Sequence, residues 1–319
     1  MKALRIVIAV ILTIALLYIA RNNSRGRPEY FSHNENGYTF EYNSVPKGLE
    51  FERTKIPLTI EGDINENAWP MLRRSRPGQI RGADPATFDI MPMSPCDTAA
   101  NCYFAEVTAG ARNGRFYYYI EVVDSTGAAL ATFTQPDGSP FMFRFIGAVP
   151  SAITLTHIVL IFATVFFISM AAMHALALIK GGTDVMPMAK YSLLAAVCAF
   201  LGGYPFGIPM NWYAFGGTWE GVPFGTDATD NKTQLLFVYL LFVTLATLGT
   251  LTKNKWGKDL YSPKALGWFA IGSFAVMWFI YLIPHSIQFS PTLTYAFCYS
   301  WIGVVFLLYL IGRLRSARA

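Results

Sequence analysis

The chain has 319 residues, of which 53% are hydrophobic and only 14% are charged. Because soluble domains carry about 25% charged residues, this composition excludes a protein that is soluble along its whole length. The 25 Phe, 17 Tyr and 7 Trp residues also exclude an intrinsically disordered chain, which would be poor in aromatic residues.

Six apolar runs are long enough, or nearly so, to cross a bilayer as helices, which takes about 20 residues. The first lies near the N-terminus, and the other five follow residue 150. We therefore expect a membrane all-α bundle of six transmembrane helices, with an inserted domain between the first two. The runs are residues 4–20, 152–179, 189–208, 234–252, 265–284 and 293–312.

The first run follows Lys2 and Arg5 and has the features of either a secretory signal peptide or a retained anchor. A cleavable signal usually ends in a small-residue site of the A-x-A type, and no clear site of this type precedes Arg21. We interpret residues 1–21 as an N-terminal transmembrane anchor.

Basic residues predict the orientation, because Lys and Arg concentrate on the cytoplasmic side. With the N-terminus inside, the inner segments carry eleven Lys or Arg residues, whereas the outer loops 204–233 and 285–292 carry only Lys232. We therefore expect a bacterial inner membrane protein with residues 22–150 and loop 203–233 in the periplasm and the C-terminus in the cytoplasm. This topology explains the net charge of +5. No concentrated basic face indicates a nucleic acid partner, so the expected partner of the helices is the lipid bilayer.

Residues 22–150 read as an all-β domain. Short runs of aromatic and β-branched residues alternate with Gly, Pro and Asp turns, which is typical of an antiparallel sandwich. We expect an immunoglobulin-like or carbohydrate-module-like fold, with residues 73–95 as a long loop. The expected strands are residues 38–42, 56–60, 115–124, 129–134 and 140–145.

Two positions in this domain suggest local chemistry. Cys96 and Cys102 are six residues apart, and outside the cytoplasm such a pair predicts a disulfide. The alternative, a redox or metal pair, has neither the C-x-x-C spacing nor a nearby His. Asp63, Glu66 and Trp69 form a possible ligand site, although Trp69 is more readily interpreted as a core residue.

The loop at 203–233 is rich in aromatic residues and glycine, and it repeats Pro-Phe-Gly at 205–207 and 223–225. Loops of this length in compact proteins are usually functional or disordered, and this composition does not favour disorder. An ordinary interfacial aromatic belt is the structural alternative. The residues of interest are Trp212, Trp219, Phe224, Asp227, Asp230 and Lys232.

Histidines provide a second signal, because ionisable residues within membrane segments are rare and often functional. His157 begins the second run and His285 ends the fifth, so the topology places both on the side of loop 203–233. Two imidazoles at one level could ligate a b-type haem, with Trp212, Trp219 and Phe224 as an aromatic cover and Lys232 near the propionates. His174 is 17 residues beyond His157, which corresponds to about 25 Å along the helix, and should lie near the other membrane surface.

At these residues the chain resembles the tryptophan-rich-loop haem-handling membrane proteins of cytochrome c maturation. In six-helix members of that family the loop follows helix three, and histidines follow helices one and five. The segment Phe215–Gly221, followed by Asp227–Thr233, resembles the family pattern W-G-x-x-W-x-W-D-x-[KR]-x-T. Phe215 and Gly221 replace two Trp residues, extra residues precede Asp227, and the inserted domain is not part of the usual layout.

This resemblance implies a membrane protein with an outer-face haem b site that acts in electron transfer or in haem handling and assembly. A different interpretation is a non-catalytic accessory subunit whose exported domain docks a protein partner in a larger membrane complex. A third is a metal or ion site at His157, His285, Asp227 and Asp230. The sequence has no G-x-S-x-G, H-E-x-x-H, Walker or Rossmann motif, which favours a protein that is not an enzyme of those classes.

Overall fold

The computed structural model describes residues 2–23, 28–76, 84, 87–97, 99–108, 110–284 and 289–318. The chain divides into two compact units. Unit 1 contains the helices, in residues 1–25, 149–212 and 217–319. Unit 2 contains the strands, in residues 26–148, together with the short segment 213–216.

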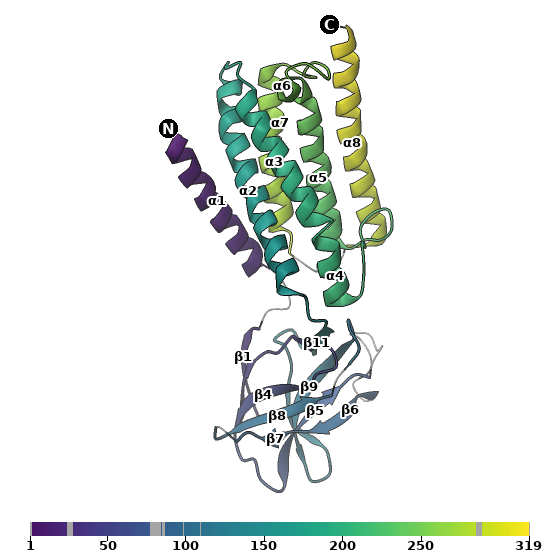
Figure 1. Ribbon diagram of the computed structural model, residues 1–319. Helices are drawn as coiled ribbons and strands as arrows, with labels where there is room; N and C mark the ends of the chain where they lie inside the picture. The colour runs from purple at the N-terminus through teal and green to yellow at the C-terminus, as the bar shows by residue number, and fades with distance from the viewer. Residues whose placement is uncertain are drawn as a thin grey trace. The chain divides into compact units, whose positions relative to one another are not determined.

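Unit 1 is a bundle of helices whose apolar residues form two buried clusters. α2 packs against α3 and α7, and α5 packs against both α3 and α7, which closes a four-helix core. α1 lies beside α2 at one side of this core, and α8 lies beside α5 at the other (Figure 1). The helices are α1 (Lys2–Asn22), α2 (Ser151–Ile179), α3 (Met186–Gly203), α4 (Gly207–Phe215), α5 (Ala228–Ala246), α6 (Leu248–Thr252), α7 (Pro263–Leu282) and α8 (Pro291–Arg318).

Small residues allow the close packing of α2 and α3. Ala171 and Ala175 on α2 and Ala195 and Ala199 on α3 are all buried. A Cβ added to Gly267 on α7 would lie 3.0 Å from the carbonyl oxygen of Ala175. Close backbone approach of this kind is what small residues permit in membrane helices, where van der Waals packing stabilises helix pairs.

Five helices in the described part of the chain are long and apolar enough to cross a membrane. They correspond to five of the six expected runs, and α4 continues the third of them to Phe215. The expected run 234–252 is instead divided between α5 and α6, because the helix is interrupted at Thr247. The first turns of α5 are polar, so its apolar part begins only at Leu235.

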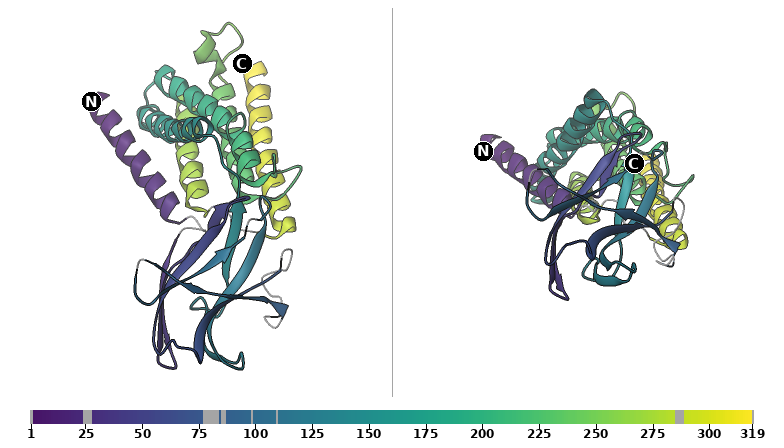
Figure 2. Two further views of the ribbon diagram at one scale, coloured as in Figure 1. Left: turned by 60° about the horizontal axis from the view of Figure 1, so that its bottom comes forward. Right: turned by 90° about the horizontal axis from the view of Figure 1, so that it is seen from below.

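Unit 2 is a β-sandwich of two sheets (Figure 2). One sheet has the order β1-β2-β4-β8-β7; the other has the order β3-β11-β9-β5-β6, with β10 also paired to β9. The pairs are antiparallel except that β3 and β11 are parallel. The strands are β1 (Tyr30–Glu35), β2 (Tyr38–Asn43), β3 (Lys47–Leu49), β4 (Thr54–Glu61), β5 (Ala68–Arg74), β6 (Asp89–Pro92), β7 (Ser94–Pro95), β8 (Cys102–Val107), β9 (Arg115–Asp124), β10 (Ala129–Phe133) and β11 (Phe141–Ile146).

Alternating side chains of the two sheets form the core of the sandwich. Phe116, Tyr118 and Ile120 on β9 point inward, whereas Tyr117 and Tyr119 are only partly buried. This period of two is the expected pattern for a strand with one face on a core. The rings of Phe40 and Phe133 stack with their centroids 5.1 Å apart. Aromatic residues thus form much of the inner layer and account for part of the aromatic content of the chain.

Two expectations for this unit are wrong in detail. The segment 73–95 is not one long loop, because β6 pairs with the end of β5 and β7 pairs with β8. Trp69 is not a core residue: Ala68, Pro70 and Leu72 take the buried positions of β5, and Trp69 is half-buried on the opposite face. The alternation along β5 is the reason, since a Trp between two inward positions points outward.

The predicted disulfide is confirmed. Cys96 and Cys102 are bonded, with their Cα atoms 5.3 Å apart. The backbone N–H of Cys96 also donates to the carbonyl of Cys102 at 2.8 Å. Cys198 and Cys298, on α3 and α8, are free.

Candidate functional site at the His157 end of the helices

His157 is held in one orientation by the end of α3. Its Nδ1 lies 2.9 Å from the carbonyl oxygen of Gly202. Because a carbonyl oxygen only accepts hydrogen bonds, Nδ1 carries the proton and Nε2 keeps its lone pair. A histidine that ligates a metal or haem iron is commonly oriented by such a bond from its other ring nitrogen. The bond therefore leaves Nε2 as the unprotonated nitrogen of the His157 ring.

Glycines make this arrangement possible. A Cβ on Gly202 would lie 3.1 Å from Cβ of Leu160, so a larger residue would push α3 away from α2. A Cβ on Gly207 would lie 3.0 Å from the carbonyl oxygen of Gly202, the atom that accepts the bond from His157. The sequence interpretation did not include Gly202. The available signal was the Gly202-Gly203 pair at the end of an apolar run, one helix away from a membrane histidine.

Trp219 packs within its own loop. Its ring stacks on Tyr204, with centroids 4.8 Å apart and an interplanar angle of 20°. Its Nε1 donates to the carbonyl of Val222 at 3.4 Å. A Cβ on Gly221 would lie 2.9 Å from the indole ring, so a glycine is needed there. Trp219 thus stabilises the conformation of the loop.

Trp212 and Phe224, the other two residues predicted to cover a haem, lie at the surface. Trp212 is 51% exposed and Phe224 is 82% exposed. α4 itself is divided between the two units, because residues 213–216 belong to unit 2. The carbonyl of Ala214 accepts a hydrogen bond from Gly147 at 2.9 Å, and the guanidinium of Arg144 lies 3.9 Å from the ring centroid of Phe215, both within unit 2.

The two aspartates at the start of α5 organise the loop. Asp227 caps the helix, and its Oδ1 accepts from the N–H groups of Thr229 and Asp230 at 2.8 and 3.0 Å. Oδ2 of Asp230 accepts from the N–H of Glu220 at 2.6 Å. Burial raises the pKa of the Asp230 carboxyl to about 6, and the charges of Asp227 and Glu220 add to this shift. Both carboxylates are thus engaged by backbone donors.

Asn231 continues the same contact. Its side chain is buried, and Oδ1 accepts from the N–H of Val222 at 2.8 Å. Asp230 and Asn231 in the first turn of α5 therefore bind the backbone amides of Glu220 and Val222, next to Trp219. The sequence marks Asn231 as part of the polar end of the loop, but the sequence interpretation assigned it no role, because its polarity does not distinguish it from other residues at the helix start.

Lys232 connects α5 to the end of α7. Its side chain is only 7% exposed, and Nζ donates to the carbonyl of Ile283 at 2.9 Å. Burial lowers the pKa of the Lys232 ammonium to about 8, and the charge of Asp227 opposes this shift. His285, the second predicted haem ligand, lies two residues beyond Ile283 and outside the described residues.

His174 lies toward the opposite end of α2 from His157. Its ring accepts a hydrogen bond from Arg5 on α1, with Nη1 3.2 Å from Nδ1, and it stacks on Tyr191.

In the described ranges, no three His, Cys, Asp or Glu side chains form a group that could hold a metal ion. The structure thus brings together His157 with Gly202, Trp219 with Tyr204, and Asp230 with the backbone of Glu220.

Comparison with protein-family models and with curated proteins finds no match for this chain.

Proposed function

We propose that the protein crosses a bacterial inner membrane six times, with the N-terminus in the cytoplasm and unit 2 in the periplasm, and that it binds haem b at the His157 end of the helices. Its role would be electron transfer or haem handling during assembly. The fold would be an immunoglobulin-like sandwich inserted into a helical membrane domain. The observation that carries the haem proposal is the orientation of His157.

The five apolar helices and the distribution of charge support the topology. The apolar part of α5 and α6 extends from residue 235 to 252, which is close to the length that a sixth span needs despite the interruption at Thr247. Basic residues cluster at the ends of the runs opposite His157. They include Lys2, Lys180, Lys190, Lys253, Lys255, Lys258, Lys264, Arg313 and Arg315.

The chemistry of His157 supports haem as the ligand. A neutral imidazole with Nδ1 bonded to a carbonyl presents Nε2 as a donor to iron. The bond from Lys232 to Ile283 fixes the chain two residues before His285, the proposed second ligand. Haem would supply a one-electron redox centre at this position. The likeness to tryptophan-rich-loop haem-handling proteins is part of the same proposal.

A pyridine haemochrome spectrum of the purified full-length chain, expressed in haem-replete cells, tests the proposal. We expect bound haem b in the wild type and its loss in His157→Ala and His285→Ala. The matched control is His174→Ala, which removes a histidine from the opposite end of α2 and should leave the haem content unchanged. A wild-type protein without haem b would overturn the proposal, and elemental analysis would then show whether the protein carries another metal.

A second candidate function is that of an accessory subunit in a larger membrane complex. Trp212 and Phe224 are both exposed, so a partner that covers loop 203–233 would bury two large aromatic side chains. The exported sandwich would then dock a protein partner. Co-purification of a stoichiometric partner, and its loss on Trp212→Ser together with Phe224→Ser, would support this function. A wild-type protein that purifies alone from mild detergent would count against it.

A further inference from the structure

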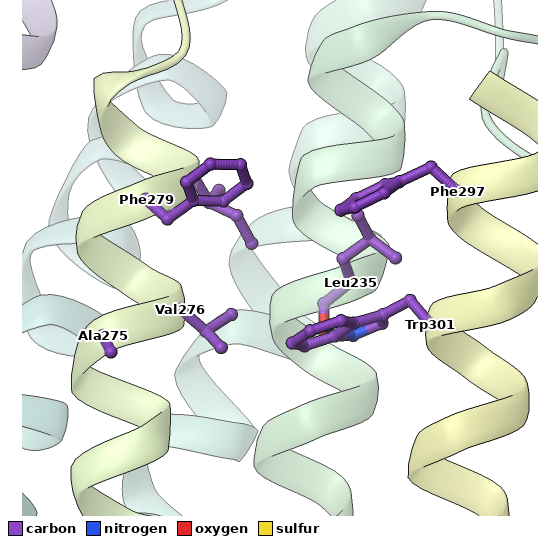
Figure 3. Close-up of a pocket in the computed structure, with 7 residues that line it drawn as sticks. Leu235, Ala275, Val276, Phe279, Phe297 and Trp301 are labelled. Carbon is purple, nitrogen blue, oxygen red and sulfur yellow. Dashed lines mark hydrogen bonds between the residues drawn. The ribbon is translucent and has the colours of Figure 1, made fainter. Parts of the chain in front are cut away.

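A narrow apolar groove lies between α7 and α8, and α5 forms its floor (Figure 3). It encloses about 250 Å³, which is less than the roughly 300–1,000 Å³ of common small-molecule sites. Six of the side chains that line the groove are labelled, and the rings of Phe279, Phe297 and Trp301 extend into the space between α7 and α8. The six are Leu235 from α5, Ala275, Val276 and Phe279 from α7, and Phe297 and Trp301 from α8.

The groove has no hydrogen bond to give to an occupant. Among these six side chains only Trp301 carries a polar atom, and its Nε1 already donates to the carbonyl of Leu235 at 3.2 Å. An occupant would therefore meet carbon atoms alone and would be held by burial of apolar surface. This lining selects a flexible hydrocarbon chain and disfavours a ligand with polar groups along its length.

Between α7 and α8 the groove opens to the outer surface of the helix bundle. Phe279 is 57% exposed and Phe297 is 47% exposed, and both lie on helices that are long and apolar enough to cross a membrane. In a bilayer, lipid tails are the hydrocarbon chains available at this depth. A lipid tail could therefore enter the groove directly from the bilayer through its open side.

A positive charge lies one helical turn beyond one end of the groove. Lys232 precedes Leu235 by three residues on α5, and Ile283 follows Phe279 by four residues, so both continue the faces that line the groove. The ammonium group has three N–H donors, and Ile283 accepts one at 2.9 Å. In the described part of the chain, no carboxylate forms a salt bridge with Lys232.

We infer that the groove binds one acyl chain of an anionic phospholipid, whose phosphate group accepts a hydrogen bond from Lys232. The depth fits: from Ile283 to Ala275 the helix rises about 12 Å, and one leaflet of the hydrocarbon core is about 15 Å thick. The inference needs only the membrane setting of the helices. It does not depend on haem, and a haem-free protein would leave it intact.

Native mass spectrometry of the full chain, delipidated in detergent and titrated with lipid, measures the headgroup effect. The probes are phosphatidylglycerol and phosphatidylcholine with identical acyl chains. We expect phosphatidylglycerol to bind about fivefold more tightly, as one lysine near a phosphate provides. Lys232→Gln should abolish this preference, Lys232→Arg should keep it, and Lys264→Gln, at the opposite end of α7, should not change it.

The tail is tested separately with a phosphatidylglycerol that carries a photoreactive group in its acyl chain. Crosslinks should fall on peptides containing Phe279 or Trp301, and Val276→Trp, which fills the groove, should remove them. Equal binding of the two lipids by the wild type, a preference that survives Lys232→Gln, or crosslinks that survive Val276→Trp would each overturn the inference. Retention of the wild-type melting temperature identifies variants that fold.

Discussion

Nδ1 of His157 on α2 donates to the carbonyl oxygen of Gly202 on α3 at 2.9 Å, across 45 residues of sequence. The bond fixes the tautomer of the imidazole and joins two helices at one end of the bundle. It depends on backbone approach, because the acceptor is a main-chain atom and the residue that carries it has no side chain. The orientation of His157 therefore depends on the close packing of α2 and α3 at Gly202.

The first prediction concerns Gly202→Ala. The new Cβ would lie 3.1 Å from Cβ of Leu160, so α2 and α3 must separate slightly. We expect a loss of about 1–3 kcal/mol in the free energy of unfolding, as for other overpacked sites, together with a lower haem content. Denaturation in mixed micelles and the haemochrome spectrum measure the two effects.

Gly303→Ala is the matched control for this change. Gly303 is also in a helix, but a Cβ there would meet no atom within 4 Å. The substitution should leave stability unchanged or raise it by up to about 1 kcal/mol, because alanine restricts the unfolded chain. If Gly202→Ala were as well tolerated as Gly303→Ala, the close approach at Gly202 would not matter for stability.

Patterns within single segments predicted much of the fold. Five apolar runs became long helices, and β9, the alternating aromatic strand, was correctly placed because one face of a strand reads directly from a period of two. The break at Thr247 and the pairing of β5 with β6 were not predicted. The pairing of β5 with β6 depends on residues that are distant in the sequence, and no local pattern reports those neighbours.

The candidate site was only partly predictable for the same reason. His157, Asp227 and Asp230 were singled out because polar residues at the ends of apolar runs are conspicuous. The partners that hold them are backbone groups of Gly202, Glu220 and other loop residues. Every residue has such groups, so the sequence gives no sign of which ones are used. The assignment of Lys232 to a haem propionate remains a prediction, while its bond to Ile283 is a structural fact.

The second prediction concerns the disulfide. Under denaturing conditions without reductant, alkylation should modify two cysteines, Cys198 and Cys298, and after reduction it should modify all four. Removing the bond with Cys96→Ser and Cys102→Ser should destabilise the sandwich by about 2 kcal/mol, as expected for a short closed loop. Limited proteolysis of the full chain across a urea series measures this loss. Modification of four cysteines without reductant would contradict the bond.

The third prediction concerns pH. Burial raises the pKa of Asp230 to about 6 in the folded chain, above the value of about 3.9 for an unfolded chain. The folded state therefore binds more protons between these values, and stability falls as pH rises from 4 through 6. Hydrogen exchange at the amide of Glu220 should be better protected at pH 5 than at pH 7.5, after correction for the intrinsic exchange rate. Asp230→Asn should remove this pH dependence, whereas Asp137→Asn in unit 2 should preserve it.

The last prediction concerns the N-terminal helix. Leu16 on α1 is fully buried in a cluster that includes Val165 and Ile168 of α2, and Arg5 bonds to His174. Removal of α1 would expose the apolar residues of α2 that it covers and would break the bond to His174. We therefore expect α1 to be retained in the mature protein. The intact mass of C-terminally tagged protein from membranes should include residues 1–21. Leu16→Ala should lower the melting temperature, because it leaves a cavity against α2, whereas Ile11→Ala, at a site that is 59% exposed, should have little effect. A mature N-terminus near Arg21 would show instead that the helix is a cleaved signal.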